Sequence, residues 1–371
     1  MDGCLVATLA ADQFRPDLEE AGVGDGKHAF SVELPRDYDD KDRHVVRVTA
    51  SGTEMDLSNS PLSGRIGAAR PQPPQVRNAF GGLWTDLSNA GDVIDGKLSL
   101  GQITDVHAEQ LRAWIENGFV ILPGAVSEAA IDELNQDIED VFAMRSDADA
   151  YVESYENETL RIGPISKEHK TQRCKLLDLH SHLESVRVTV FAEPIIDFLS
   201  LVFERPALAF QALGFRRGSR QQMHHDSTYV RVSSPLELAA SWIAPEDIQP
   251  GSGELEYYVG SHRLEPYLFE GTKKWMPPNS PEHDRYLASL HEQSQALVLE
   301  RQTFLAKKGD ALIWSADLAH GGSEVATPVS RKSFVTHYCP LSCEPIYGDD
   351  KPGTSKIRFG DAAYYCAVGR P

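Results

Sequence analysis

The sequence predicts a mainly β protein with flanking helices, in which a small β-sandwich module precedes a larger domain. Residues 1–67 contain short segments of alternating polarity between Gly- and Asp-rich turns, as in small antiparallel sandwiches. A proline-containing linker, 68–82, follows, and beyond it strand-like runs alternate with segments of helical periodicity. Because a chain of 371 residues exceeds the usual ~100–200 residues of one domain, we expect the larger domain to span residues 83–371.

The N-terminal module is predicted from three strand candidates, residues 5–9, 27–34 and 43–49. Segments 14–18, 22–30 and 59–62 also resemble an accessory β-module of bacterial glycosyltransferases and other glycan-handling enzymes. That resemblance implies contact with a glycan, whereas a packing or dimerisation module explains the same pattern equally well. Prolines in segment 68–75 stiffen the linker, and the aromatic segment 80–86 is expected to dock on the larger domain.

The start of the larger domain has recognisable helix boundaries. Thr104 or Asp105 is expected to cap a helix that Gly118 ends, and residues 119–122 then form a buried strand. Ser127 is expected to cap a second helix, whose apolar side chains recur at helical spacing. Those side chains are Ile131, Leu134, Ile138, Val141 and Phe142.

The segment 223–228 carries a candidate metal-binding pair. It follows an apolar run, 208–215, and is expected to lie on or beside a β-strand. Because side chains alternate in a strand, His224 and Asp226 share one face and His225 points to the other. One imidazole and one carboxylate are two of the three ligands in the 2-His-1-carboxylate triad of non-haem Fe(II) sites. A hydrogen-bonded surface pair is the alternative interpretation.

His320 is the best candidate for the third ligand. It ends the apolar segment 314–319, where two following glycines allow a tight turn. Three other histidines compete for this role. His225 faces away if the strand is regular, His262 follows a turn and is expected to order a hairpin, and His337 lies too far along its strand.

Arg331 supports a site for an anionic ligand. It follows His320 by eleven residues and begins the alternating strand 331–338, in which it shares a face with Ser333 and His337. A buried guanidinium without an anion costs several kcal/mol and cannot lose its proton. A carboxylate that accepts two hydrogen bonds satisfies it.

Together, His224-x-Asp226, His320 and Arg331 resemble the phytanoyl-CoA dioxygenase family of Fe(II)/2-oxoglutarate oxygenases. The similarity runs from about Leu83 to the C-terminus. It includes segments 114–124, 241–244 and 251–263. The resemblance implies a double-stranded β-helix, which is a cupin-like jelly roll of two packed sheets.

The resemblance also implies a 2-oxoglutarate-dependent non-haem iron dioxygenase. His224, Asp226 and His320 are then the Fe(II) ligands, while Arg331 binds the far carboxylate of 2-oxoglutarate. The implied reaction consumes O2, hydroxylates a small molecule and releases succinate and CO2. Asp226 argues against a halogenase, which needs an open position for halide where the carboxylate lies.

Three further positions match cosubstrate contacts in the resembled family. Lys175 matches a lysine near the 2-oxoglutarate carboxylates, although an exposed lysine without such a role explains it equally well. The amide of Gln211 lies in an apolar strand and needs a polar partner. Trp242 matches a tryptophan beside the cosubstrate and is also a natural core residue.

The sequence departs from the family after the distal histidine, where Gly321-Gly322 stands in place of the common Gly-Ser. The hydroxyl that helps bind the carboxylate then comes from Ser323 or Ser333, or Arg331 does more alone. Two rival classes stay open. A metal-dependent cupin-like enzyme that does not use 2-oxoglutarate has no need of Arg331. A catalytically silent small-molecule or glycan-binding protein is expected to lack at least one of the three metal ligands.

Residues 264–302 leave the strand pattern and are expected to form a lid-like insertion with a helix over 282–297; scaffolding is the alternative. Its side chains that suit stacking on a substrate are Tyr267, Phe269, Trp275 and Met276. Upstream, residues 184–203 predict a helical pair around Pro194.

The composition limits partners and location. A net charge of −19 disfavours nucleic acid and anionic membranes, and favours a neutral or cationic small molecule over a CoA thioester. The chain lacks a run of ~18 apolar residues and its start lacks a signal-peptide pattern, so we expect a cytoplasmic protein. The five cysteines are expected to be free thiols, although Cys339 and Cys343 also suggest half of a zinc site.

Overall fold

The computed structural model describes residues 1–14, 24–32, 43–53, 55–57, 60–65, 79–156, 159–219, 221–327, 329–346 and 354–367. The chain forms two compact units, Met1–Gln75 with Leu87–Ala108, and Val76–Asp86 with Glu109–Pro371. Residues 87–108 are therefore grouped with the N-terminal residues, although the sequence assigns them to the larger domain. The linker segment 68–75 lies outside the described residues, and the domain roles stay predictions.

The first unit contains two short antiparallel pairs and one helix. Its elements are β1 (Gln13–Phe14) with β2 (Lys27–Ala29), β3 (Arg43–Val46) with β4 (Leu62–Arg65), and α2 (Ala90–Ser99). The predicted strand 5–9 is wrong, because these residues form no ladder with any residue that the structure describes, and Leu5 and Leu9 are exposed. Segments 15–18, 22–23, 33–34 and 59 lie outside the described residues, and the sandwich and its glycan contact stay predictions.

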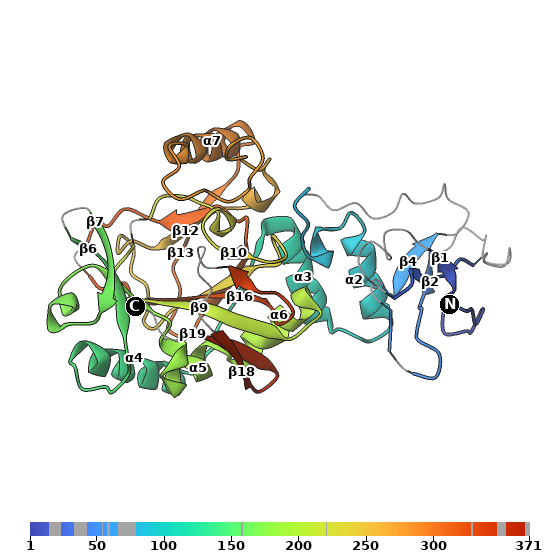
Figure 1. Cartoon of the computed structure of the whole chain (residues 1–371), viewed down its shortest axis with the longest axis horizontal. Coiled ribbons are helices and arrows are strands. Elements are labelled where there is room, and N and C mark those ends of the chain that lie inside the picture. The colour runs from blue at the N-terminus through green and yellow to red at the C-terminus, as the bar shows by residue number, and fades with distance from the viewer. Residues whose placement is uncertain are drawn as a thin grey trace. The chain divides into compact units, whose positions relative to one another are not determined.

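A ten-stranded sheet dominates the second unit (Figure 1). Its order is β5 (Phe119–Leu122), β14 (Ala311–Ser315), β11 (Ala239–Ile243), β16 (Ser333–Pro340), β9 (Ala207–Phe215), β8 (Cys174–Leu177), β6 (Tyr151–Glu156) and β7 (Thr159–Pro164). β19 (Ala362–Ala367) pairs with β9 and with β18 (Thr354–Phe359). A three-stranded sheet has the order β13 (Arg301–Phe304), β12 (Leu255–Tyr258) and β15 (His320–Gly322), and β10 (Arg231–Val232) pairs with β17 (Pro345–Ile346).

Large apolar side chains from both sheets form one core. Trp242 and Trp314 of the large sheet pack with Tyr257 and Phe304 of the small sheet. The Trp242 and Phe304 rings meet edge to face with centroids 5.7 Å apart. The two sheets therefore face each other, and the predicted jelly roll, mainly β with few helices, is confirmed.

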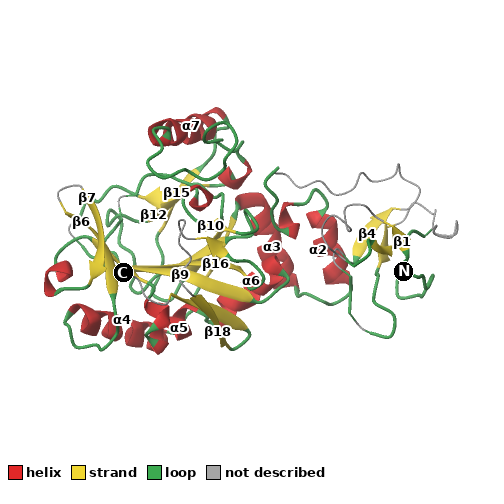
Figure 2. Ribbon diagram, in the orientation of Figure 1, coloured by secondary structure: helices red, strands yellow, loops and turns green. Residues whose placement is uncertain are grey.

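Helices flank the sheets in the second unit (Figure 2). They are α3 (Asp105–Asn117), of which residues 105–108 are grouped with the first unit, α4 (Glu128–Phe142), α5 (Glu184–Val190), α6 (Glu193–Phe203) and α7 (His283–Ala296). The 3-10 turns are η2 (Trp84–Asp86), η3 (Lys167–Lys170), η4 (Leu179–Ser181), η5 (Asp226–Thr228) and η6 (Ser261–Arg263). The predicted caps are confirmed, since His107 N donates to Thr104 Oγ1 and Ala130 N to Ser127 Oγ. Within the described residues, we find no helix with the length and apolar character that a membrane span requires.

The predicted aromatic tether docks as expected. Trp84 Nε1 donates to the Leu201 carbonyl at 3.0 Å, and the buried Thr85 hydroxyl accepts from Trp114 Nε1 at 3.2 Å. The cysteines that the structure describes, Cys4, Cys174, Cys339 and Cys343, are free thiols.

Gly118 and Gly124 allow a matched test of the α3 terminus. Both have positive φ, where an alanine costs about 1 kcal/mol. A Cβ at Gly118 would lie 2.5 Å from His262 Nδ1, and His262 Nε2 binds the Ile115 carbonyl, whereas a Cβ at Gly124 meets nothing within 4 Å. We expect Gly118→Ala to lower the free energy of unfolding, measured in urea, clearly more than Gly124→Ala. Equal losses would show that His262 does not pack against this turn.

Candidate metal site

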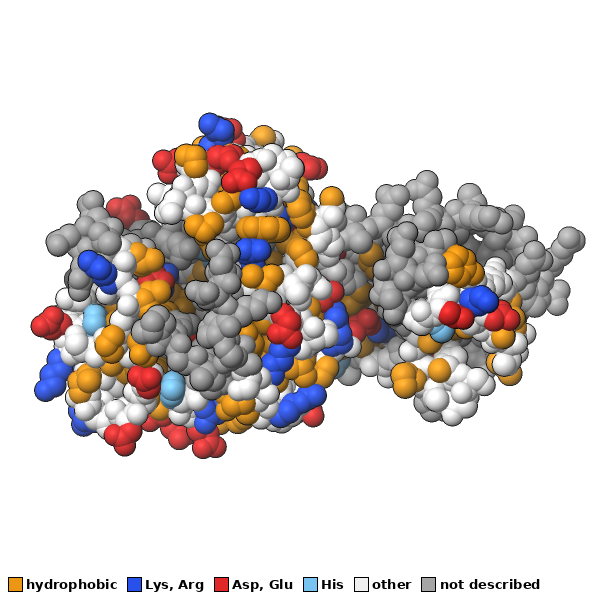
Figure 3. Space-filling model, viewed as in Figure 1, with side chains coloured by type: hydrophobic (Ala, Val, Ile, Leu, Met, Phe, Trp, Pro, Cys, Tyr) orange, Lys and Arg blue, Asp and Glu red, His pale blue; other side chains and the backbone are white. Residues whose placement is uncertain are grey.

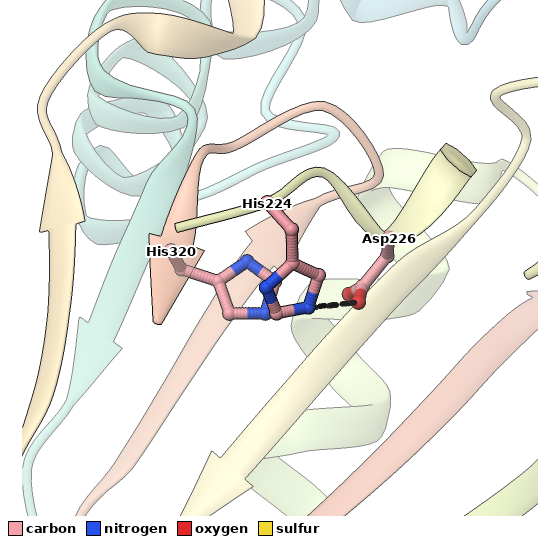
Figure 4. A group of neighbouring side chains, drawn as sticks. All are labelled: His224, Asp226 and His320. Carbon is pink, nitrogen blue, oxygen red and sulfur yellow. Dashed lines mark ion pairs between the residues drawn. The ribbon is translucent and has the colours of Figure 1, made fainter. Parts of the chain in front are cut away.

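His224 and His320 are brought together by direct backbone pairing. His224 N donates to His320 O at 2.9 Å, and His320 N donates to His224 O at 3.0 Å. The two rings lie on the same side of this bridge, with centroids 4.5 Å apart. The expected strand around residue 224 is thus a single bridge, and Asp226 begins the 3-10 turn η5 instead of sharing a strand face. The turn still directs the Asp226 carboxylate toward both rings (Figure 4).

The glycines after His320 have a different role from the predicted one. Gly321 lies in β15 and does not form a tight turn. A Cβ at this position would lie 2.8 Å from Gln221 O and 3.0 Å from Met223 N. The missing side chain therefore lets the segment before His224 approach β15 closely enough for the bridge to form.

The hydrogen bonds of the two imidazoles determine which nitrogen is available to a metal. His224 Nδ1 donates to the Gln222 carbonyl at 2.8 Å, and His320 Nδ1 donates to the Leu318 carbonyl at 2.9 Å. In a neutral ring, Nε2 then carries the lone pair. These Nε2 atoms lie 3.7 and 3.6 Å from Asp226 Oδ1, an arrangement that accommodates one divalent ion about 2.1 Å from each atom.

Electrostatics favour a charged Asp226 carboxylate beside a neutral His320 imidazole. Burial opposes ionisation of Asp226, but the neighbouring His320 and His337 and further hydrogen bonds outweigh it and hold its pKa well below the ordinary value. Trp314 Nε1 also donates to Asp226 Oδ2 at 2.7 Å. Burial lowers the pKa of His320 to about 4, so this ring is neutral at pH 7. One carboxylate oxygen and two imidazole nitrogens are a donor set for a divalent transition metal.

Arg331 lies buried on the inner side of the large sheet. Its Nε donates to the Gly253 carbonyl and its NH1 donates to Ser333 Oγ, both at 2.6 Å. The guanidinium lies over the Trp242 ring, 5.6 Å from its centroid. Burial lowers the pKa of Arg331 to about 10, so it remains a cation at pH 7. Within the described part of the chain, no carboxylate lies within ion-pair distance of it.

Of the two serines proposed to supply the hydroxyl, only Ser333 contacts Arg331. Ser323 Oγ instead donates to the Glu254 carboxylate, which also accepts from Gly251 N at 2.5 Å and Gly253 N at 3.2 Å. Glu254 thereby orders the loop whose Gly253 carbonyl holds Arg331. The sequence interpretation missed this residue, because a glutamate after Gly-Ser-Gly reads as an ordinary turn residue.

A family model described as phytanoyl-CoA dioxygenase (PhyH) matches residues 114–333, which is more than half of the chain. The chain belongs to the phytanoyl-CoA dioxygenase family. This membership confirms the predicted enzyme class, a 2-oxoglutarate-dependent non-haem iron dioxygenase.

Named relatives agree with this assignment. Phytanoyl-CoA dioxygenase, peroxisomal, of Bos taurus is 24% identical over 67% of this chain and 72% of its own length. Ectoine dioxygenase of Nocardia farcinica (strain IFM 10152) is 25% identical over 62% of this chain and 76% of its own length. The fold is similar to that of the non-heme alpha ketoglutarate dependent epimerase SnoN from nogalamycin biosynthesis, with a TM-score of 0.52, 16% identity and coverage of 70% of this chain and 98% of that chain.

The other positions predicted from the phytanoyl-CoA dioxygenase family lie on the same inner sheet face. Phe215 of β9 pairs with Lys175 of β8 on one side and with Ser333 of β16 on the other, so the three residues lie in one row across the strands. Lys175 Nζ, however, makes an ion pair with Glu153 Oε1 at 2.7 Å. Gln211 lies across from His337 in the next strand. The cosubstrate roles of Lys175 and Gln211 stay predictions.

The insertion 264–302 is anchored on the turn η5, which contains Asp226. Buried Lys274 makes an ion pair with Asp317 at 2.9 Å, and Asp317 accepts from Ser227 Oγ. Met276 N donates to Thr228 O at 2.9 Å. The lid role stays a prediction.

One of the insertion's predicted stacking residues is unsuited to that role. Phe269 is fully buried, and its ring packs against those of Tyr267 and Tyr286, which also contact each other. Tyr286 in turn accepts from His225 N at 2.7 Å. Phe269 therefore belongs to the core of the insertion.

Replacement of His224, Asp226 or His320 by alanine should abolish tight Fe(II) binding without unfolding the chain. Each change removes one of three protein ligands, and two ligands hold a divalent ion poorly. His225→Ala is the matched control, because this neighbouring buried histidine is outside the group of three. Anaerobic Fe(II) titration and circular dichroism check both statements. Tight binding by the Asp226→Ala protein would contradict the site.

The metal-free protein should lose stability as the pH falls from about 6.5 toward 4. Burial lowers the pKa of His320 to about 4 and that of His225 to about 3, whereas an unfolded histidine titrates near 6.5. The unfolded chain therefore binds more protons in this window, and acid favours it. Thermal unfolding between pH 7 and pH 4 measures the effect, and His225→Gln should make the slope shallower. A pH-independent melting temperature would contradict these shifts.

Proposed function

We propose that this chain hydroxylates a small molecule in a reaction that consumes 2-oxoglutarate and O2 and releases succinate and CO2. His224, Asp226 and His320 hold Fe(II), and Arg331 binds the far carboxylate of 2-oxoglutarate. The observation that carries the proposal is the buried Arg331 cation, which has no carboxylate within ion-pair distance among the described residues. The charge of the nearby Glu254 only partly offsets the effect of burial, because the pKa of Arg331 still falls. A dicarboxylate cosubstrate supplies the missing anion.

Each residue has a role that follows from its contacts. The backbone carbonyls of Gln222 and Leu318 orient His224 and His320 so that both Nε2 atoms face Asp226. Bound Fe(II) supplies the activation of O2 that is coupled to decarboxylation of 2-oxoglutarate. The Gly253 carbonyl and Ser333 hydroxyl fix the Arg331 side chain, so its remaining N–H groups are directed before the cosubstrate arrives.

Further cosubstrate contacts are proposed for three residues. Trp242 supports the face of the Arg331 guanidinium. Lys175 would have to break its ion pair with Glu153 to bind a cosubstrate carboxylate. Gln211 has its amide on the same face of the sheet as the partly exposed Leu213, which lies two positions along the strand. We therefore rank Trp242 above the other two.

The rival classes are less well supported. A cupin-like metal enzyme that does not use 2-oxoglutarate leaves the buried Arg331 without an explanation. A silent binding protein has no need for two imidazoles whose Nδ1 atoms are both held so that Nε2 is available.

The proposed substrate is a neutral or cationic small molecule. Tyr229 is 40% exposed, its ring lies 5.5 Å from that of His224, and its hydroxyl meets His283 Nε2 at 2.7 Å. This pair joins the metal-binding turn to α7 and is a polar contact point for substrate. On the face seen in Figure 3, acidic and basic side chains of the described residues are intermixed, and these residues form no extended basic patch for a polyanion. Glycan or homo-oligomer contact through the N-terminal unit and a cytoplasmic location stay proposals.

Succinate formation tests the function directly. Protein loaded anaerobically with Fe(II) should form succinate when 2-oxoglutarate and O2 are added, and a screen of small molecules should find compounds that accelerate it. Either rival class predicts no succinate above a metal-free control.

Arg331→Ala should weaken the apparent affinity for 2-oxoglutarate by tens-fold or more, because loss of a charge-assisted contact in a closed site costs roughly 2–5 kcal/mol. Fe(II) binding should be unchanged. The adjacent Lys332→Ala is the control, since Lys332 Nζ donates to Asn135 instead. An unaltered 2-oxoglutarate titration in the Arg331→Ala protein would reject the arginine as the cosubstrate clamp.

A further inference from the structure

The Asp226 carboxylate fits between two rings on the inner face of the large sheet. Ala240 of β11 pairs with Trp314 of β14 on one side and with His337 of β16 on the other. Residues paired across strands project from the same face, so the two rings flank the small Ala240 side chain. We call Trp314, Ala240 and His337 the carboxylate seat.

The two oxygens of Asp226 face different groups. Oδ1 lies 3.7 Å from His224 Nε2 and 3.6 Å from His320 Nε2. Oδ2 lies 2.7 Å from Trp314 Nε1 and 3.2 Å from His337 Nε2. The carboxylate therefore has one oxygen directed to the two imidazoles and the other directed into the seat.

The burial of the His337 side chain is not explained by a polar contact other than the one with Asp226. The side chain is 3% exposed, and neither ring nitrogen makes a hydrogen bond of regular geometry with a described residue. Burial of an unpaired polar group costs free energy, so such groups call for a specific explanation. The nearby Asp226 oxygen supplies one, because catalytic contacts in ligand-free sites are often long and tighten when the ligand binds.

We propose that His337 is a positioning residue for Asp226. With Trp314 it donates an N–H to Oδ2, which holds the carboxylate so that Oδ1 alone serves as the metal ligand. A carboxylate free to rotate can bind a metal through both oxygens and fill a position that the cosubstrate and O2 require. This inference rests on the proposed metal site.

Co(II) binding to the full chain tests the proposal without turnover. Loss of a group that orients a metal ligand typically weakens metal affinity by about 10–100-fold. We expect that loss, and a changed Co(II) absorption spectrum, for both His337→Phe and His337→Leu, which remove the N–H. His337→Gln keeps an N–H donor and should recover much of the affinity. Trp314→Phe should weaken Co(II) binding as well. In the protein that combines Trp314→Phe with His337→Phe, the losses of Co(II) affinity should not be additive.

Thr336→Val is the matched control, because Thr336 precedes His337 on β16 and faces the other side of the sheet. Native Co(II) affinity and spectrum in a folded His337→Phe or His337→Leu protein would overturn the proposal. Equal losses in the Gln, Phe and Leu variants would also overturn it, since they would reflect packing alone. Failure of the unsubstituted chain to bind Co(II) would instead reject the metal site itself.

Discussion

The reciprocal backbone pairing between His224 and His320 is the contact on which the site depends. These residues are about a hundred positions apart, and two hydrogen bonds bring their imidazoles onto one side of a two-residue bridge. Gly321 allows the approach, because any side chain there would overlap the backbone of Gln221 and Met223. Asp226 follows at the first turn after the bridge, so a single local pairing determines the positions of all three ligand groups.

Two buried charges of opposite sign lie in this interior without pairing with each other. Asp226 is surrounded by histidines and an indole N–H, and Arg331 is held by a carbonyl and a hydroxyl. Burial of an ion without a close counterion is unfavourable, and neutral hydrogen-bonding partners offset only part of that cost. In the proposed function, a metal cation at Asp226 and a dicarboxylate at Arg331 supply close counterions. Ligand binding is therefore expected to stabilise the fold as well as enable the chemistry.

Local sequence patterns predicted much of the fold. Thr104 and Ser127 cap their helices as expected, and residues 119–122 form β5. The hairpin β6–β7 is not predicted although residues 159–162 alternate, and helix α2 is not predicted because its helical periodicity is weak. Residues 5–9 alternate like a strand but form no ladder within the described part of the chain, since alternation alone does not supply a neighbouring strand.

The site was predicted in its residues more than in its geometry. The sequence predicts that His224, Asp226 and His320 come together, and they do, but a bridge and a 3-10 turn replace the expected strand. Their metal role and the role of Arg331 stay predictions. The sequence also places His337 too far along its strand to reach the site, whereas its Nε2 lies 3.2 Å from Asp226 Oδ2. Its position beside Asp226 depends on the register of β11 with β14 and β16, which is a tertiary property. The ion pair of Lys175 with Glu153 is likewise a cross-strand contact that no local pattern reveals.

The most direct measurement is anomalous diffraction at the iron edge from crystals loaded with Fe(II) and 2-oxoglutarate without oxygen. The account predicts one iron within about 2.3 Å of His224 Nε2, Asp226 Oδ1 and His320 Nε2, with a 2-oxoglutarate carboxylate on Arg331. Iron bound elsewhere, bound directly by His337, or bound with the cosubstrate away from Arg331 would contradict it.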